Sequence, residues 1–253
     1  MEIHNHQSAI GNRQFSHPSL FLASSNPGKL REFREAAAAR GVVVEALPGF
    51  ADIAACVEDG TTFEENARQK AIHYSRSFPG WVFADDSGLC VDALNGAPGV
   101  YSARFAGPEA TDEQNNHLLL EEIHRVEAGA RLDVRLPSPF NRNSKFENRN
   151  SMSSSRVSNF DFRLPAAPGT RAAHYLCVIA LAEGGQVRTV VEGRADGAII
   201  DEPRGAGGFG YDPYFFYLPL GKTFAEMPPE EKFAVSHRGA AFRKLLDYLC
   251  KRG

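Results

Sequence analysis

The sequence predicts an α/β protein, and three observations lead to that fold class. In the N-terminal half, short apolar runs alternate with longer amphipathic segments, which is the pattern of strands that alternate with helices. In the C-terminal half, two β-rich runs flank Gly184-Gly185, which predicts a hairpin. The 253 residues are 43% hydrophobic and 23% charged, so the chain is of ordinary globular composition. It is long enough for one large domain or two small ones.

Composition and charge give no indication of a nucleic-acid or membrane partner. The net charge is only -3, and no apolar run approaches the length that crosses a bilayer. Residues 1–18 are polar and rich in His and Asn, so we expect a flexible extension rather than a secretory signal. The four cysteines lack CxxC spacing, and we expect free thiols in a reducing cytoplasm.

The first predicted unit is a strand, a polar loop and a helix. Leu20–Ala23 forms the strand, Ser24–Lys29 the loop, and the helix runs from about Lys29 to Arg40. Loop N–H groups and a helix N-terminus both favour an anion, so this unit is a candidate phosphate site. It is not a Walker A loop, because Ala23 replaces its first glycine and Leu30 its Ser/Thr. A plain strand-to-helix turn is the alternative.

A second strand, Val42–Ala46, precedes a second helix, which runs from Phe63 to about Ser77. Thr62, with a glutamate three residues later, has the spacing of a capping box and predicts the start of this helix. Asn66 and Lys70 are four residues apart and therefore share one face of the helix. On a solvated surface this pairing would carry no function.

Two adjacent carboxylates follow the third predicted strand, Trp81–Ala84. Asp85 and Asp86 are expected at the strand end, where Ser87-Gly88 breaks the strand before another begins at Leu89. Carboxylates packed this closely repel each other, so they would either hold a metal ion or share one proton. The alternative is a solvated turn, because Asp-Asp-Ser-Gly is also ordinary turn chemistry.

A helix capped by Thr111 leads into a stretch of different character, residues 128–173. Within it, Pro137 to Arg156 is rich in Asn, Ser and Arg and has almost no apolar residues to bury. A compact domain rarely holds a structureless loop of this length, so we predict a disordered insertion in a domain that spans 19–253. Its arginines leave nucleic-acid contact open, although no aromatic residues are interleaved with them.

The remaining elements follow the hairpin. The expected order is hairpin strands 174–182 and 187–192, a short strand 198–200, a glycine-rich loop 204–213, an aromatic strand 213–217, a short helix or turn 226–232, and a last helix 237–251. Glycines in the loop allow backbone N–H groups to approach a ligand closely. Ser236 is expected to cap the last helix, with His237 and Arg238 as side-chain donors at its start.

Six motifs stand in the order SSNPGK, FEENA, ADDSG, GGFGYDP, EEK and SHRG. Together they make the chain similar to the inosine/xanthosine triphosphate pyrophosphatase family, whose members remove non-standard purine nucleotides. The resemblance covers nearly the whole chain except residues 1–18 and 128–173. It implies an elongated α/β fold, in which a long mixed sheet forms two lobes around a central cleft, and a homodimer. The insertion departs from the family pattern near the hairpin.

The resemblance also implies the reaction and the residues that perform it. Water would attack the α-phosphorus of inosine, deoxyinosine or xanthosine triphosphate and release pyrophosphate. Glu58 and Asp86 would hold Mg²⁺, Asp86 would orient or deprotonate the water, Lys70 would reach a phosphate, and Asp85 would assist Asp86. The residues implied to bind substrate are Ser24, Ser25, Asn26, Pro27, Gly28, Lys29, Ser87, Phe209, Gly210, Tyr211, Asp212, Lys232, His237 and Arg238.

Three other classes of protein are possible. A non-catalytic nucleotide-binding module would need the lysines and glycine loops but not the carboxylates. A Maf-type nucleotide pyrophosphatase would be expected to have an arginine-rich loop in place of Asn26–Lys29. A nucleic-acid protein acting through the insertion would show strongly salt-dependent binding.

Overall fold

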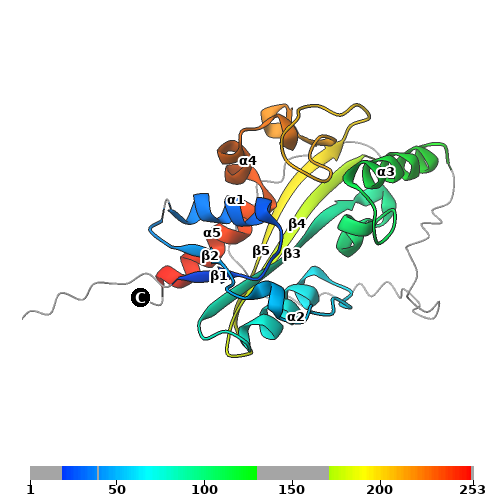
Figure 1. The fold of residues 1–253 in the computed structure, drawn as a ribbon. Helices are drawn as coiled ribbons and strands as arrows, with labels where there is room; N and C mark the ends of the chain where they lie inside the picture. Colours follow the sequence, from blue (N-terminus) through cyan, green and yellow to red (C-terminus); the bar gives the residue numbers. More distant parts are fainter. Residues whose placement is uncertain (1–18, 39, 130–170, 252–253) are drawn as a thin grey trace, which may run out of the picture.

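A seven-stranded mixed sheet forms the centre of the protein, in the order β2-β1-β3-β4-β5-β6-β7 (Figure 1). The computed structural model describes residues 19–38, 40–129 and 171–251. Strand β1 is parallel to β2 and β3, and the other neighbouring strands are antiparallel. The strands are β1 Leu20–Leu22, β2 Val44–Ala46, β3 Trp81–Val91, β4 Ala172–Glu183, β5 Gln186–Ile199, β6 Phe215–Tyr217 and β7 Lys222–Thr223. The predicted α/β class and mixed sheet are therefore confirmed.

Polar capping residues precede several of the helices. The α-helices are α1 Pro27–Ala38, α2 Phe63–Ser75, α3 Asp112–Glu127, α4 Pro229–Val235 and α5 His237–Cys250. Short 3-10 helices are η1 Phe50–Asp52, η2 Asp92–Leu94, η3 Gly99–Arg104, η4 Leu218–Leu220 and η5 Phe224–Glu226. Thr62 and Thr111 both form complete capping boxes, and Ser236 accepts a hydrogen bond from the Gly239 N–H. Each cap supplies a partner for N–H groups that have none inside the helix.

The predicted break at Ser87-Gly88 is wrong, because β3 is one continuous strand. Residues Val82 to Val91 pair without interruption with β4. Gly88 fits because a Cβ there would collide with the Gly99 carbonyl and the Ser102 hydroxyl of η3. Long-range pairing thus overrides the local turn preference of Ser-Gly. The expected strand 198–200 is likewise part of β5, which ends at Ile199.

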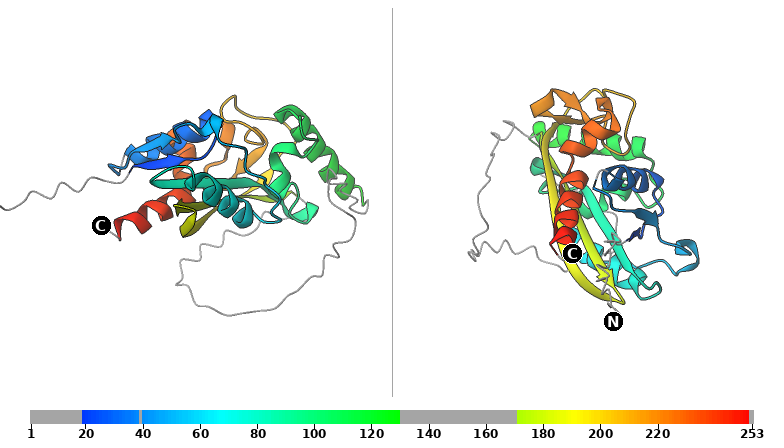
Figure 2. Two further views of the ribbon diagram at one scale, coloured as in Figure 1. Left: turned by 60° about the horizontal axis from the view of Figure 1, so that its bottom comes forward. Right: turned by 90° about the vertical axis from the view of Figure 1, so that its left-hand side faces the viewer.

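Helices cover both faces of the sheet at one end of the long strands (Figure 2). On one face, α1 and α5 bury Phe33 and Phe242 against Phe83 of β3. On the other face, alanines of α2 pack on alanines of β3 and β4. Full burial of each Phe is worth roughly 1.5–3 kcal/mol. Helix α5 approaches β5 closely at Gly193, where a Cβ would overlap the His237 carbonyl.

A second lobe forms at the other end of β3, β4 and β5, which run through both lobes (Figure 1). Its core contains Leu89, Leu119, Tyr175, Phe215 and Phe224. Helix α3 supplies one side, and β6 with η5 supplies another. The long strands therefore join two separately packed cores, and the region between them positions the site described below.

Several predictions fall outside the described residues. These include the extension 1–18 and residues 130–170 of the predicted insertion. Strand β4 begins at Ala172, so the last two residues of the predicted insertion belong to the sheet. The four cysteines are free thiols. None of the described helices is long and apolar enough to cross a bilayer.

Candidate active site

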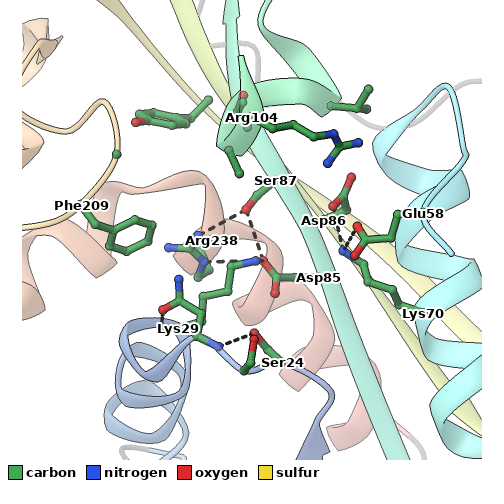
Figure 3. Close-up of a pocket in the computed structure, with 18 of the residues that line it drawn as sticks. Ser24, Lys29, Glu58, Lys70, Asp85, Asp86, Ser87, Arg104, Phe209 and Arg238 are labelled. Atoms are coloured by element: carbon green, nitrogen blue, oxygen red, sulfur yellow. Dashed lines mark hydrogen bonds and ion pairs between the residues drawn. The ribbon is translucent and has the colours of Figure 1, made fainter. Parts of the chain in front are cut away.

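A cavity of about 580 Å³ lies where the two lobes meet (Figure 3). Its walls come from the β1–α1 loop, the segment before α2, β3, η3, the start of α3, the glycine-rich loop, α4 and α5. Of the predicted site residues it is lined by Ser24, Ser25, Asn26, Lys29, Glu58, Lys70, Asp85, Asp86, Ser87, Phe209, Gly210, Tyr211, Asp212, Lys232, His237 and Arg238. Pro27 and Gly28 do not line it. Helix α1 begins at Pro27 rather than at the predicted Lys29, so these three residues form its first turn and only Lys29 reaches the cavity.

The β1–α1 loop is held in a fixed shape by its own polar side chains. Asn26 Oδ1 accepts hydrogen bonds from the N–H groups of Gly28 at 2.8 Å and Lys29 at 3.1 Å. Ser24 Oγ accepts one from the Asn26 N–H at 3.2 Å. Asn26 therefore caps α1 with its oxygen, while its Nδ2 donors remain for a ligand in the cavity.

Asp85 lies in a cationic environment on one face of β3. Its carboxylate is 2.8 Å from Lys29 Nζ and 3.8 Å from Arg238 Nε, and its side chain is only 1% exposed. Burial alone would raise the pKa of Asp85, but Lys29 and Arg238 outweigh it and hold the pKa well below its usual range. Asp85 is consequently an ionised carboxylate.

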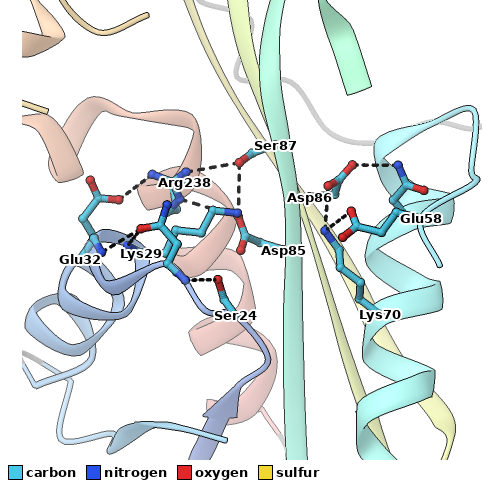
Figure 4. A network of polar contacts seen from close by, with 12 residues as sticks. Ser24, Lys29, Glu32, Glu58, Lys70, Asp85, Asp86, Ser87 and Arg238 are labelled. Atoms are coloured by element: carbon cyan, nitrogen blue, oxygen red, sulfur yellow. Dashed lines mark hydrogen bonds and ion pairs between the residues drawn. The ribbon is translucent and has the colours of Figure 1, made fainter. Parts of the chain in front are cut away.

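Asp86 lies on the opposite face of β3, together with α2 (Figure 4). Lys70 Nζ is 2.8 Å from Asp86 and 3.0 Å from Glu58, and Asn66 Nδ2 donates to Asp86 at 3.2 Å. Burial raises the pKa of Asp86, with Lys70 and Asn66 opposing the shift. Burial would lower the pKa of Lys70, but Asp86 and Glu58 outweigh it and raise that pKa. Lys70 is thus a charged ammonium between two carboxylates.

The expectation that Asp85 and Asp86 share one metal ion or one proton is wrong. Consecutive residues of a strand point to opposite faces, and β3 is continuous at this point. Each carboxylate has its own lysine, Lys29 for Asp85 and Lys70 for Asp86. The pair of carboxylates that does share a cation is Asp86 and Glu58. These two come from β3 and from the segment before α2.

A buried charge network joins α1, the glycine-rich loop, α4 and α5. Glu32 accepts from Arg238 Nη1 at 2.6 Å and from Lys232 Nζ at 3.2 Å, and Lys232 Nζ also donates to Asp212 at 2.7 Å. Lys232 and Arg238 lie 4.8 and 5.4 Å from the centre of the Phe209 ring. Burial would raise the pKa of Glu32, but Arg238 and Lys232 outweigh it and lower that pKa. The network fixes two cations beside one aromatic face.

His237 is the first residue of α5 and is buried. Its ring stacks on Tyr175, with 4.6 Å between centroids and 8° between the ring planes. Burial, reinforced by Arg238 and Lys232, lowers the pKa of His237 well below its usual value, against the opposing charge of Asp85. His237 is therefore a neutral imidazole in the folded protein.

Four residues in or beside the cavity have no role in the sequence-based site: Arg104 and Asp112 line it, and Asn116 and Glu32 contact residues that line it. Asp112 Oδ2 accepts from the Gly210 N–H at 2.7 Å, and Asn116 Nδ2 donates to the Gly210 carbonyl at 3.0 Å. Glu32 could have been suspected, because it lies three residues after Lys29 on the same helix face. Sequence spacing gives no comparable signal for Arg104, nor for Asp112, whose partner Gly210 is 98 positions away.

The family model described as "Ham1 family" matches residues 20–138 and 153–248. The chain belongs to the Ham1 family. All six sequence motifs fall within the matched ranges. The unmatched residues 139–152 lie inside the stretch that the sequence predicts to be an insertion.

Relatives and solved structures of the Ham1 family agree with this assignment. Two proteins named dITP/XTP pyrophosphatase are similar over most of their length. That of Acidobacterium capsulatum is 42% identical, covering 90% of this chain and 96% of the relative, and that of Desulfotalea psychrophila is 39% identical, covering 90% and 83%. The structure of a HAM1 protein from Coxiella burnetii shares 33% identity with a TM-score of 0.69, covering 92% of this chain and 99% of the other.

Proposed function

We propose that this Ham1 family chain hydrolyses non-standard purine nucleoside triphosphates, dITP and XTP among them, to the nucleoside monophosphate and pyrophosphate. One observation carries the proposal: a single cavity joins the Lys70 cluster with Asp86 and Glu58 to an aromatic ring flanked by Lys232 and Arg238. The first cluster suits a phosphate group under attack, and the second suits a base. The names of the relatives supply the class of nucleotide.

The phosphate chain is best accommodated along the β1–α1 loop. The start of α1 presents N–H groups and the positive end of the helix dipole. Asn26 keeps Nδ2 donors for a ligand, and Lys29 is 18% exposed in the cavity although it pairs with Asp85. Lys70, on the other face of β3, supports the phosphate that is attacked. These groups would neutralise charge on both sides of β3, which is the main requirement of phosphoryl transfer.

The donor set beside Lys70 fits Mg²⁺. Glu58 and Asp86 already converge on one cation, the Lys70 ammonium, at 3.0 and 2.8 Å. Mg²⁺ commonly takes one or two carboxylates and completes its shell with water and substrate oxygens. No cluster of three or more His, Cys, Asp or Glu in the described ranges could hold a metal without such help. Bound Mg²⁺ would supply charge neutralisation and acidify a coordinated water.

The protein's own groups can orient and deprotonate the attacking water. Asp86 is held by Asn66 and Lys70, so its carboxylate has a fixed direction in the cavity. A carboxylate at hydrogen-bond distance from a water can accept its proton as the water attacks the α-phosphorus. The Lys70 ammonium, beside Asp86, faces the negative charge that develops on the phosphate. The leaving group is pyrophosphate, and the products are neutralised by the same cations.

The base is best placed on the Phe209 ring. That side chain is 37% exposed, and it offers an aromatic face to a purine. The bases of inosine and xanthosine carry an oxygen acceptor at C6, where adenine carries an amino donor. Arg238 is always protonated and can only donate, so it favours the keto bases.

Pyrophosphate release from a panel of nucleoside triphosphates tests the proposal. The panel contains dITP, XTP, dATP and dGTP, each with and without Mg²⁺. We expect pyrophosphate, rather than orthophosphate, from dITP and XTP in the presence of Mg²⁺, and far slower release from dATP. Equal turnover of all four nucleotides, or stepwise release of orthophosphate, would contradict it.

We further propose that the enzyme works as a homodimer in the cytoplasm. Support comes from the family resemblance and from the free thiols of the described chain. Light scattering on the purified protein measures the oligomeric state, and a monomer at micromolar concentration would contradict the dimer. The predicted disorder of the insertion stays a prediction.

A further inference from the structure

Among the residues that the structure describes, charge pairing in the cavity leaves one cation unmatched. The cationic side chains that line it are Lys29, Lys70, Arg104, Lys232 and Arg238. Lys29 pairs with Asp85, Lys70 with Asp86 and Glu58, and Lys232 and Arg238 both pair with Glu32. Within residues 19–38, 40–129 and 171–251, Arg104 forms no ion pair. Its charge is therefore available to an anionic ligand without breaking an existing pair.

The backbone places Arg104 on the same face of β3 as Asp86. Asp86 and Gly88 are two residues apart in one strand, so they point to the same side. Helix η3 packs over Gly88, because a Cβ there would meet the Gly99 carbonyl and the Ser102 hydroxyl. Ser102 Oγ also accepts from the Leu89 N–H at 2.9 Å. Arg104, the last residue of η3, thus follows a segment fixed beside the Asp86 cluster.

Asn115 of α3 holds the turn that carries Arg104. This side chain is 3% exposed, donates to the Ala103 carbonyl at 3.2 Å and accepts from the Ala106 N–H at 2.8 Å. These two hydrogen bonds hold the backbone on either side of Arg104, at Ala103 and at Ala106. In Figure 3 the Arg104 guanidinium lies on the side of the cavity that holds Glu58 and Asp86, and Phe209 lies on the other side. The position of Arg104 is therefore set by the fold rather than by a flexible loop.

Tyr101 lies beside the guanidinium of Arg104. The central carbon of the Arg104 guanidinium lies 5.2 Å from the centre of the Tyr101 ring. Such a contact leaves the charge of the guanidinium unneutralised, and a guanidinium carries five N–H donors in one plane. A planar fork of donors matches two oxygens of a phosphate better than a lysine ammonium does.

We propose that Arg104 binds the phosphate chain of the substrate on the Asp86 side of the cavity, an inference that rests on the proposed function. Lys29 and the start of α1 hold the chain from the opposite face of β3. Arg104 adds the cation that no carboxylate of the described residues neutralises. The phosphate chain is thus bound by donors from both faces of β3, with η3 on one face and α1 on the other.

Binding and kinetics of Arg104→Gln and Arg104→Lys test this role. Arg188→Gln is the matched control, because Arg188 is a surface arginine that pairs with Glu183 and does not line the cavity. Calorimetry measures the affinity for inorganic triphosphate, which requires no turnover. We expect Arg104→Gln to weaken it at least about tenfold, as for a lost charge-assisted hydrogen bond, with Arg104→Lys in between. The kcat/KM for dITP should fall in parallel, and the control should match wild type.

Deoxyinosine, which carries no phosphate, locates the contact. Its competitive inhibition should be the same in wild type and Arg104→Gln. Unchanged triphosphate affinity in a folded Arg104→Gln variant, or weaker inhibition by deoxyinosine, would overturn the assignment. A different result would contradict the proposed function: wild type binds inorganic triphosphate but releases no pyrophosphate from dITP or XTP. In that case a loss of triphosphate affinity in Arg104→Gln still supports the role of Arg104 as a phosphate ligand.

Discussion

Asp85 and Asp86 are consecutive residues of β3, and their carboxylates lie on opposite faces of the sheet. Lys29 Nζ is 2.8 Å from the first, and Lys70 Nζ is 2.8 Å from the second. The two aspartates therefore belong to different parts of the site. Asp85 balances the cations beside the β1–α1 loop and the base region, whereas Asp86 faces Glu58 and the proposed metal. Substitution of Asp86 should therefore reduce turnover, whereas substitution of Asp85 should reduce stability.

Asp86→Asn should leave the fold intact and abolish nearly all turnover. Asparagine keeps the shape and the contact with Asn66 or Lys70, but it removes the proposed metal ligand and proton acceptor. Loss of such a group raises the barrier by several kcal/mol, which corresponds to about a thousandfold in rate. Pyrophosphate release at saturating Mg²⁺ measures the effect, and Asp92→Asn is the control because Asp92 is 61% exposed at the end of the same strand. A rate above about one tenth of wild type would refute the assignment.

Asp85→Asn should instead destabilise the protein. The change leaves Lys29 and the buried Arg238 without their shared carboxylate, and removal of one partner from a buried ion pair costs about 3 kcal/mol or more. Urea unfolding at neutral pH measures the free energy of unfolding. Asp247→Asn is the control, since its 3.4 Å contact with Arg40 is exposed. Wild-type stability in Asp85→Asn would refute this prediction and would mean that Glu32 is sufficient to balance Arg238 and that Lys29 needs no carboxylate partner.

His237 should make stability fall as the pH drops below about 6.5. Burial, with Arg238 and Lys232, keeps the folded pKa of His237 well below that of the unfolded chain, against the opposing charge of Asp85. Below the unfolded pKa only the unfolded chain takes the proton, so acid favours unfolding by up to about 1.4 kcal/mol per pH unit. His237→Phe keeps a ring against Tyr175 but cannot take up a proton. Urea unfolding between pH 7.5 and about pH 5.5 should therefore show a weaker dependence of the free energy of unfolding on pH than in wild type. His117 is exposed, so the control variant His117→Gln should keep the wild-type dependence of the free energy of unfolding on pH.

Arg238→Ala should narrow the discrimination between bases. The guanidinium lies 5.4 Å from the Phe209 ring centre and is held by Glu32 at 2.6 Å, so it is fixed beside the expected base position. We expect kcat/KM for inosine triphosphate to fall at least about tenfold, with a much smaller change for ATP. Thermal unfolding measures how much stability the variant loses because the buried carboxylates of Glu32 and Asp85 no longer have Arg238 as a partner. Equal losses on both nucleotides would assign Arg238 to the phosphates or the sugar.

Local rules predicted the parts of the fold that depend on near neighbours. The Thr62 capping box, the cap at Ser236 and the Gly184-Gly185 hairpin are each determined by residues within a few positions, and each is present. The same locality explains why Asn66 and Lys70 were correctly placed on one helix face. Both donate to Asp86.

Tertiary pairing decided what local rules could not. Ser87-Gly88 has the composition of a turn, but β3 pairs with β4 without a break from Val82 to Val91. As consecutive residues of this continuous strand, Asp85 and Asp86 point to opposite faces. Glu32 and Arg238 are 206 positions apart in the sequence, so no local sequence pattern predicts that they form an ion pair. The sequence thus predicted the residues that gather at the cavity better than it predicted which of them touch.

The contact between Asp112 and Gly210 gives a prediction about substrate affinity. Asp112 Oδ2 accepts from the Gly210 N–H at 2.7 Å and so ties the glycine-rich loop to the start of α3. Gly210 adopts φ +62°, and it directly follows Phe209, whose ring is proposed to carry the base. Loss of this hydrogen bond should let the loop move and place the ring less accurately in the free enzyme.

Asp112→Ala should therefore raise KM for dITP roughly threefold to tenfold with a smaller change in kcat, because a hydrogen bond to a charged group contributes about 1.5–3 kcal/mol and Asn116 still holds the Gly210 carbonyl. Glu113→Ala is the matched control, since Glu113 is the next acidic residue in the first turn of α3 and contributes equally to its helix dipole. Steady-state kinetics of both variants, with their melting temperatures, separate a loop effect from a loss of helix stability. Equal changes in the two variants would mean that the charge at the start of α3, rather than the bond to Gly210, is what matters.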